Sequence, residues 1–192
     1  MNETPTGNYS ERIYTYGDSE WGDKLTAYNG NAFTYDTAGN PTTYYNGGAP
    51  YTFRWEGRNL VYASVDGKEL TFAYNDEGLR IEKKIGDVAH HYYYHGSQLI
   101  ADEWNKNILL FLYDENGSPI GMRLHKAADG EDVWSEYWYE TNLQGDIIAV
   151  YDSSGTVLVT YTYDAWGRST MTYQNGGRST GVVYNPLRYR GY

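Results

Sequence analysis

The chain has 192 residues, with 15 Lys and Arg against 25 Asp and Glu, a net charge of −10, and no cysteine. Binding to a phosphate backbone needs Lys and Arg to displace counterions, so this balance excludes nucleic acid as a direct partner. The lack of cysteine excludes disulfides, thiol catalysis and Cys-ligated metal sites. No apolar run approaches the roughly 20 residues of a membrane-spanning helix, and the first residues, MNETP, lack the features of a signal peptide.

The hydrophobic composition is unusual. Leu, Ile, Val and Phe together number 33, whereas Tyr and Trp alone number 29. So few aliphatic residues with this net charge would suggest disorder, but disordered chains are poor in aromatic residues. We therefore expect a folded chain whose core is built of Tyr and Trp, forming a single domain over residues 1–192.

Aromatic residues recur with a period of about twenty. Each is followed by an acidic or polar residue and then by Gly, and the first six are separated by 19, 20, 19, 20 and 19 residues. We interpret them as anchors of a repeat: Tyr16, Tyr35, Trp55, Tyr74, Tyr94, Tyr113, and, at longer spacing, Tyr139 and Tyr163. The expected repeat turns contain Asp36, Gly39, Gly57, Gly78, Asp114, Gly117, Gly145, Asp164 and Gly167.

Each repeat is predicted to be a β-hairpin. Residues 60–65 and 68–74 have the composition of strands, and Asp66-Gly67 between them accepts the positive φ angles of a two-residue turn. The extra length at residues 126–132 predicts a longer hairpin tip. We expect an all-β fold of antiparallel hairpins, regular over residues 1–121 and continuing through a longer hairpin over 122–192. A β-sandwich with chance spacing is the alternative.

The Tyr-Asp-x-x-Gly units resemble the YD repeats of the Rhs family, whose relatives include insect-toxin-complex shells and teneurins. Residues 142–148, 152–155 and 161–167 are similar to the entry into the Rhs repeat-associated core, and NPLRYRGY at 185–192 is similar to the segment that follows it. The resemblance covers residues 12–192. It implies that the hairpins form a curved, shell-like sheet, here an open arc.

The resemblance also implies a function. Family members use such a sheet as a non-catalytic wall that encloses or displays a C-terminal effector, usually a toxin released by self-cleavage. Because the sequence ends before the family's cleavage site, we expect a fragment of a larger secreted or cell-surface bacterial polypeptide. The expected partners are the remainder of that polypeptide and its effector. A surface module that binds carbohydrate through exposed Trp and Tyr is the alternative.

Three patterns could suggest chemistry. His91 and His95 share one strand face with Tyr93, but no third ligand lies nearby in the sequence. Ser19 in Gly-Asp-Ser lacks a base at a characteristic spacing, and the acidic loop that starts at Asp114 has Pro119 where a calcium loop needs Gly. We therefore expect no catalytic residue, no metal site and no cofactor.

The tryptophans and the sheet edges offer interaction surfaces. Trp21, Trp55, Trp104, Trp134, Trp138 and Trp166 could stack on sugar rings, although Trp55 and Trp166 occupy repeat positions where packing is the simpler role. An open sheet also exposes its edge strands, and residues 182–184, expected to form the last one, carry no charge. We predict that such an edge pairs with a second copy or is covered by a crossing segment.

Overall fold

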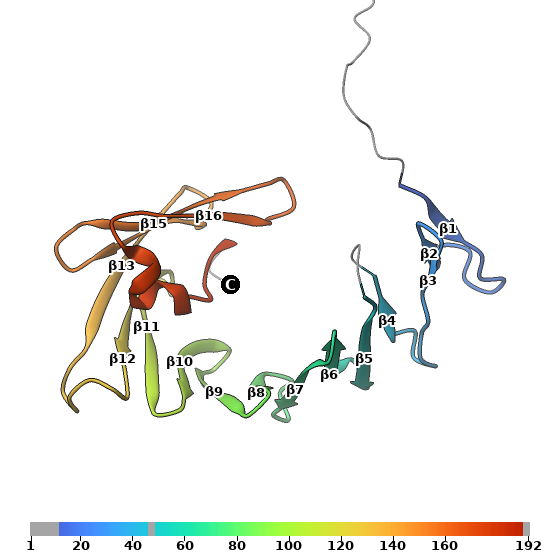
Figure 1. Ribbon diagram of the computed structural model, residues 1–192, viewed down its shortest axis with the longest axis horizontal. Helices are drawn as coiled ribbons and strands as arrows, with labels where there is room; N and C mark the ends of the chain where they lie inside the picture. The colour runs from blue at the N-terminus through green and yellow to red at the C-terminus, as the bar shows by residue number, and fades with distance from the viewer. Residues whose placement is uncertain (1–11, 46–48, 190–192) are drawn as a thin grey trace, which may run out of the picture. The chain divides into compact units, whose positions relative to one another are not determined.

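The computed structural model describes residues 12–45 and 49–189. These residues fold into β-strands and turns, without an α-helix, so the predicted all-β class is confirmed (Figure 1). The strands are β1 (Tyr14–Tyr16), β2 (Leu25–Tyr28), β3 (Asn31–Ala32), β4 (Thr43–Tyr44), β5 (Tyr51–Glu56), β6 (Asn59–Val65), β7 (Lys68–Tyr74), β8 (Arg80–Ile85), β9 (Val88–His95), β10 (Gln98–Trp104), β11 (Asn107–Tyr113), β12 (Pro119–His125), β13 (Ser135–Thr141), β14 (Ile147–Asp152), β15 (Val157–Tyr163) and β16 (Ser169–Tyr173).

The strands form two antiparallel sheets in which sequence neighbours pair with each other. Strands β1 to β3 make a small sheet, and β4 to β16 make an open sheet of 13 strands in strict sequence order. Backbone contacts divide the chain into two compact units, Met1–Gly78 with Lys84–Asp87, and Leu79–Lys83 with Val88–Tyr192. The expected domain organisation, a single domain over residues 1–192, stays a prediction.

The turn chemistry explains why the chain reverses where it does. Asp66 and Gly67 have φ angles of 49° and 72°, so both residues adopt the left-handed conformation that the two-residue turn between β6 and β7 requires. The longer tip predicted around residues 126–132 is also present, because β12 ends at His125 and β13 begins at Ser135. Asn46-Gly47, another expected turn, lies outside the described residues.

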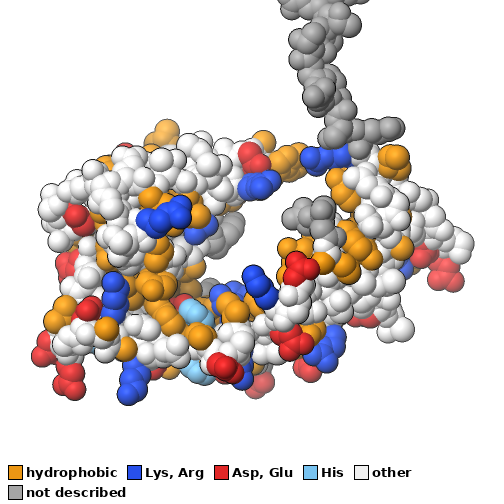
Figure 2. Space-filling view, in the orientation of Figure 1, with side chains coloured by type: hydrophobic (Ala, Val, Ile, Leu, Met, Phe, Trp, Pro, Cys, Tyr) orange, Lys and Arg blue, Asp and Glu red, His pale blue; other side chains and the backbone are white. Residues whose placement is uncertain are grey.

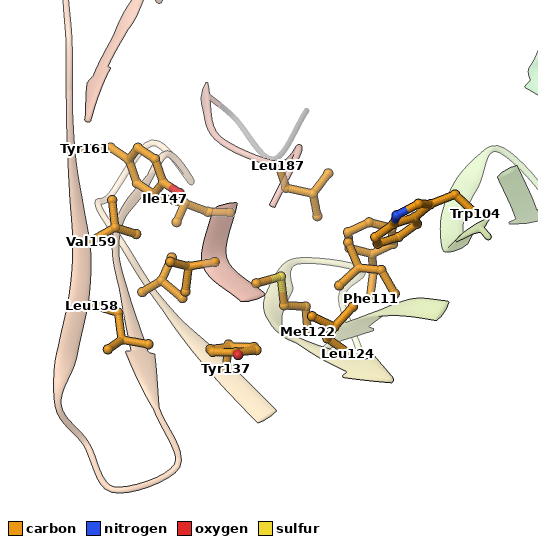
Figure 3. Close-up of a cluster of buried hydrophobic side chains, with 13 residues drawn as sticks. Trp104, Phe111, Met122, Leu124, Tyr137, Ile147, Leu158, Val159, Tyr161 and Leu187 are labelled. Carbon is orange, nitrogen blue, oxygen red and sulfur yellow. The ribbon is translucent and has the colours of Figure 1, made fainter. Parts of the chain in front are cut away.

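The buried core belongs to the second unit and lies on one face of strands β10 to β15. Its least exposed side chains are mostly aliphatic: Leu109, Met122, Leu124, Ile147, Val150, Val159, Val182 and Asn185. Trp104, Phe111, Tyr137 and Tyr161 complete the cluster, and Figure 3 shows these side chains converging from successive strands and from the C-terminal segment around Leu187. The expectation of a core built of Tyr and Trp is therefore wrong: aliphatic side chains predominate, and four tyrosines, Tyr113, Tyr139, Tyr163 and Tyr173, are only partly buried beside the cluster.

The C-terminal segment crosses the core instead of extending the sheet. After β16 the chain forms two short 3-10 turns, η1 (Gly177–Ser179) and η2 (Gly181–Tyr184) (Figure 1). The first turn contacts β15, and the second approaches β12 and β13 at Gly181. We call residues 177–189 the strap. The expectation that residues 182–184 form an exposed edge strand is wrong: Val182 is buried in the core, and the end strand of the large sheet is β16.

The surface gives no sign of a membrane segment or of a concentrated charge. The described residues include no helix with the length and apolar character needed to span a bilayer. On the face shown in Figure 2, the acidic side chains appear singly or in small groups among uncharged ones.

Candidate functional site: the aromatic ladder

Several repeat turns are organised by an Asp or Asn side chain in their first position. Oδ1 of Asp36 accepts hydrogen bonds from the backbone N–H groups of Ala38 and Asn40, both at 2.9 Å. The N–H of Gly39 donates to the carbonyl of Asp36, and Gly39 has a φ of 84°, which a side chain would strain. The carboxamide of Asn40 and these amides stabilise the carboxylate, so they lower the pKa of Asp36.

The same turn recurs along the chain. Asp114, Asn142, Asp152 and Asp164 each accept two backbone N–H bonds at Oδ1, and Asn75 accepts one. The glycines expected in these turns all have positive φ: Gly57, Gly78, Gly117, Gly145 and Gly167. The repeat spacing aligned the Asn75 turn with the Asp36 turn, but it did not identify Asn142 and Asp152 as equivalent acceptors. The spacing Asp/Asn-x-x-Gly would have identified them.

The anchor side chains connect each hairpin to the one before it. The hydroxyl of Tyr113 donates to the backbone carbonyl of Leu99, fourteen residues earlier, with an O–O distance of 2.6 Å. Five more anchors make an equivalent bond: Tyr35 to Leu25 (2.6 Å), Trp55 Nε1 to Pro41 (2.7 Å), Tyr74 to Leu60 (3.0 Å), Tyr94 to Arg80 (3.0 Å) and Tyr163 to Ile147 (2.5 Å). We call these six bonds the aromatic ladder.

Four of the six accepting carbonyls lie at β-bulges. Leu99 pairs directly with the preceding anchor, Tyr94, and the register then skips Ile100, so that Ala101 pairs with Tyr93. The same one-residue skip follows the acceptors Leu25, Leu60 and Ile147. A bulge disturbs the hydrogen bonds between the strands, and a buried carbonyl without a donor is costly. The next anchor supplies a donor there, which gives every ring a defined depth and direction.

Two expected anchors differ from this pattern. Tyr16 pairs with Leu25 at the beginning of the described chain and is 56% exposed. Tyr139 donates to Oδ1 of Asn185 in the strap, at 2.9 Å, and not to a carbonyl of the preceding hairpin. The turn that follows it begins at Asn142, so the residue in the anchor position is Thr141, two residues beyond the one that the spacing indicated.

Asn185 is the centre of the contact between strap and sheet. It is only 1% exposed, its Oδ1 accepts from Tyr139 and from the N–H of Leu187, and its Nδ2 donates to the carbonyl of Leu187 at 2.8 Å. Burial raises the pKa of Tyr139 well above its ordinary value, so this hydroxyl stays a donor. The N–H of Ile147 donates to the carbonyl of Arg188 at 2.9 Å. The strap is thereby hydrogen-bonded to two strands.

Two glycines allow the strap to approach the sheet this closely. A Cβ at Gly177 would lie 2.0 Å from the carbonyl oxygen of Leu158, and one at Gly181 would lie 2.6 Å from Leu124 Cδ2. The N–H of Gly181 donates to the hydroxyl of Tyr137 at 2.9 Å. The sequence showed a glycine-rich stretch here, but nothing in it indicated which strands those glycines meet.

A histidine that the sequence did not single out forms the most buried ion pair described. Nδ1 of His90 lies 2.9 and 3.0 Å from the two carboxylate oxygens of Asp102, and its ring stacks on Trp104 with 5.1 Å between centroids. Trp104 in turn contacts Tyr184 of the strap. Burial raises the pKa of Asp102, and the hydrogen bond and positive charge of His90 oppose that shift. The pair joins β9 and β10 to the strap.

The residues considered for catalysis or metal binding lie apart. His91 is exposed and pairs with Glu82 at 3.6 Å, and His95 is also exposed, in the last position of β9. Ser19 follows Asp18, whose Oδ1 accepts from the N–H groups of Glu20 and Trp21. Within residues 12–45 and 49–189 no three His, Asp or Glu side chains come close enough to hold a metal ion.

The tryptophans divide into packed and exposed ones. Trp104 is buried, and Trp55 is half-buried with its Nε1 bonded in the ladder. Trp166 is 91% exposed at the tip between β15 and β16, so the expected packing role is wrong for this residue. Trp21 is 62% exposed and borders a hollow of about 290 Å³ that also includes Asp18, Lys24 and Asp36.

Comparison with known protein families matches residues 142–184, from the Asn142 turn to the end of η2, to the RHS repeat. These residues form an RHS repeat. Over 177 residues it is 33% identical to the tRNA3(Ser)-specific nuclease WapA of Bacillus spizizenii and 32% identical to the tRNA nuclease WapA of Bacillus subtilis. Each alignment covers 88% of this chain, which spans only 7% of the length of either relative.

Two solved structures of toxin proteins show a weak likeness to this chain. The Tc holotoxin pore of Photorhabdus luminescens matches 88% of this chain with a TM-score of 0.43 and 14% identity, and the TcdB2–TccC3 complex matches the same share with a TM-score of 0.43 and 13% identity. In both cases this chain covers 8% of the larger one.

Proposed function

We propose that this RHS-repeat chain is part of a non-catalytic β-repeat wall that encloses or displays a C-terminal effector of a longer, secreted or cell-surface bacterial polypeptide. The observation that carries the proposal is the aromatic ladder. Every rung joins a side chain to the backbone of the preceding hairpin, so the sheet can be lengthened by repeating one unit. Such a construction suits a wall, whose task depends on extent and not on one reactive site.

The relatives support placing the wall and any nuclease activity in different parts of the longer polypeptide. Two of them are named as tRNA nucleases, yet this chain corresponds to 7% of their length. The acidic composition argues against contact with RNA phosphates. We therefore assign any nuclease activity of the parent to residues outside this chain.

Two measurements test the wall role. The purified 192-residue chain, incubated with total tRNA, should leave it intact; cleavage would contradict the non-catalytic assignment.

In the parent polypeptide, limited proteolysis should release the C-terminal effector slowly, and Tyr94→Phe with Tyr113→Phe should accelerate that release. Tyr93→Phe is the matched control because its hydroxyl bonds an exposed Glu103 side chain. Equal release from all three forms would refute an enclosing or protective wall.

Carbohydrate binding at a cell surface is a second candidate, favoured by the exposure of Trp21 and Trp166. Flat aromatic rings in water can stack on the apolar faces of sugars. Binding of the chain to purified bacterial wall polysaccharide, compared with Trp21→Ala and Trp166→Ala, measures this. Binding that neither substitution weakens, or no binding at all, would eliminate the candidate.

A further inference from the structure

The aromatic ladder has one step that no ring fills. Tyr113 pairs with Pro119 and the register then skips Ile120, just as Tyr94 pairs with Leu99 and the register skips Ile100. At the equivalent steps the carbonyl after the anchor accepts the polar hydrogen of the next anchor. Among the described residues, the carbonyl of Pro119 receives no such side-chain bond, because the next anchor position holds Thr141 and Tyr139 bonds to the strap.

A hollow lies beside this step, between Pro119 and the anchor position at Thr141. It has a volume of about 400 Å³ and is bordered by the turn before β12 and the turn after β13, including Gly117, Pro119, Thr141 and Leu143. This volume lies within the range of about 300–1,000 Å³ that is usual for small-ligand sites. Leu143 is fully exposed to solvent at the rim, so an apolar side chain is available to cover a bound ring.

We propose that this hollow binds a tyrosine side chain presented by a partner polypeptide. The bound ring would occupy the place that Tyr113 occupies one step earlier, and its hydroxyl would donate to the carbonyl of Pro119. The six filled rungs define the chemistry that fits: a flat ring with one hydrogen-bond donor at its tip. The proposal does not depend on the wall function, because the site is defined by the ladder alone.

The binding test uses the 192-residue chain and two matched probes. N-acetyltyrosinamide and N-acetylphenylalaninamide differ only by the hydroxyl, and each is titrated while backbone amide NMR signals are followed. The tyrosine probe should shift the signals of Gly117, Ser118 and Asn142 and should bind roughly fivefold more tightly, the factor expected for one hydrogen bond. Equal affinity of the two probes, shifts elsewhere, or no shifts would overturn the proposal.

Substitutions provide the second arm. Thr141→Tyr places a ring in the anchor position, so it should abolish binding of the probe and raise the melting temperature. Thr170→Tyr, which adds a tyrosine at an exposed position of β16, is the matched control and should change neither. Leu143→Ser alters a fully exposed side chain and should weaken binding at least about threefold, whether or not Thr141→Tyr folds. Undiminished binding in Thr141→Tyr or in Leu143→Ser contradicts the assignment.

Discussion

Removing a single hydroxyl from the ladder, by Tyr113→Phe, tests whether these bonds hold the hairpins together. The ring of Tyr113 packs against the buried cluster, and Phe keeps that packing. What is lost is the 2.6 Å bond to the carbonyl of Leu99. Tyr113 is half-buried, so water only partly reaches this bond, and the same burial raises the pKa of Tyr113. The carbonyl is therefore left at a bulge with little solvent to replace the donor.

The expected loss follows from these conditions. A hydrogen bond contributes about 1 kcal/mol net, and leaving its buried acceptor unpaired raises the cost to roughly 1.5 kcal/mol for this half-buried site. For a chain of this size that corresponds to a fall in melting temperature of about 3–6 °C. Urea unfolding, followed by tryptophan fluorescence and far-ultraviolet circular dichroism, measures the difference, and the denaturant slope should not change.

A neighbouring tyrosine is the control. The hydroxyl of Tyr93 donates to Glu103 Oε2, and Tyr93 is 48% exposed, so water can replace that partner. Tyr93→Phe should change the free energy of unfolding by less than about 0.5 kcal/mol. If Tyr113→Phe and Tyr93→Phe have the same effect, the ladder bonds contribute no more than surface contacts and the reasoning fails.

Three further outcomes are expected. Asn185→Ala should lower the free energy of unfolding by about 2–4 kcal/mol, since it leaves the Tyr139 hydroxyl and the Leu187 backbone unpaired. It should also shift Trp104 emission to the red; unchanged emission would mean that the strap stays docked without the Asn185 side chain. Gly177→Ala should lower the free energy of unfolding by at least about 3 kcal/mol, because the new Cβ meets the Leu158 carbonyl. Gly22→Ala, with open space around it, should leave the free energy of unfolding nearly unchanged. Similar losses of stability in the two variants would disprove close packing of the strap. Burial raises the pKa of Tyr163 from 10.0 to about 12. The folded state therefore favours the neutral phenol, and this contribution to stability is fully present below pH 10 and is lost as the pH rises through 12. Tyr163→Phe should be less sensitive to alkali than the wild type when tyrosinate absorbance and unfolding are followed together. Identical alkaline profiles would contradict that sign.

The period of the anchors, and with it the hairpins, could be predicted because each unit carries its own local information. Asp66-Gly67 specifies a turn by its φ preferences alone, and Tyr-Asp-x-x-Gly specifies another. Local chemistry does not reveal which carbonyl an anchor reaches. The acceptor of Tyr113 depends on a bulge at Ile100, which only the pairing of two strands creates.

Long-range packing explains what the sequence did not show. His90 forms the more buried contact with a carboxylate, because its side chain turns toward Asp102 on the next strand, whereas His91 meets Glu82 at the surface. Tyr139 has the right residue type but lies two positions before the anchor position at Thr141, and its partner Asn185 is 46 residues away. The aliphatic core has the same origin: Leu, Ile and Val residues scattered over several strands and the strap form one buried cluster.

The order of donors and acceptors in the ladder also matters during synthesis of the chain. Every donor lies later in the chain than its acceptor, by ten residues at Tyr35 and by sixteen at Tyr163. A ribosome that delivers this chain from its N-terminus therefore exposes each carbonyl before the side chain that will bind it. A nascent hairpin can dock on a finished surface as soon as its own anchor has emerged, without waiting for a distant segment. The sheet can thus grow at the rate of synthesis, and only the strap must wait for the last strand.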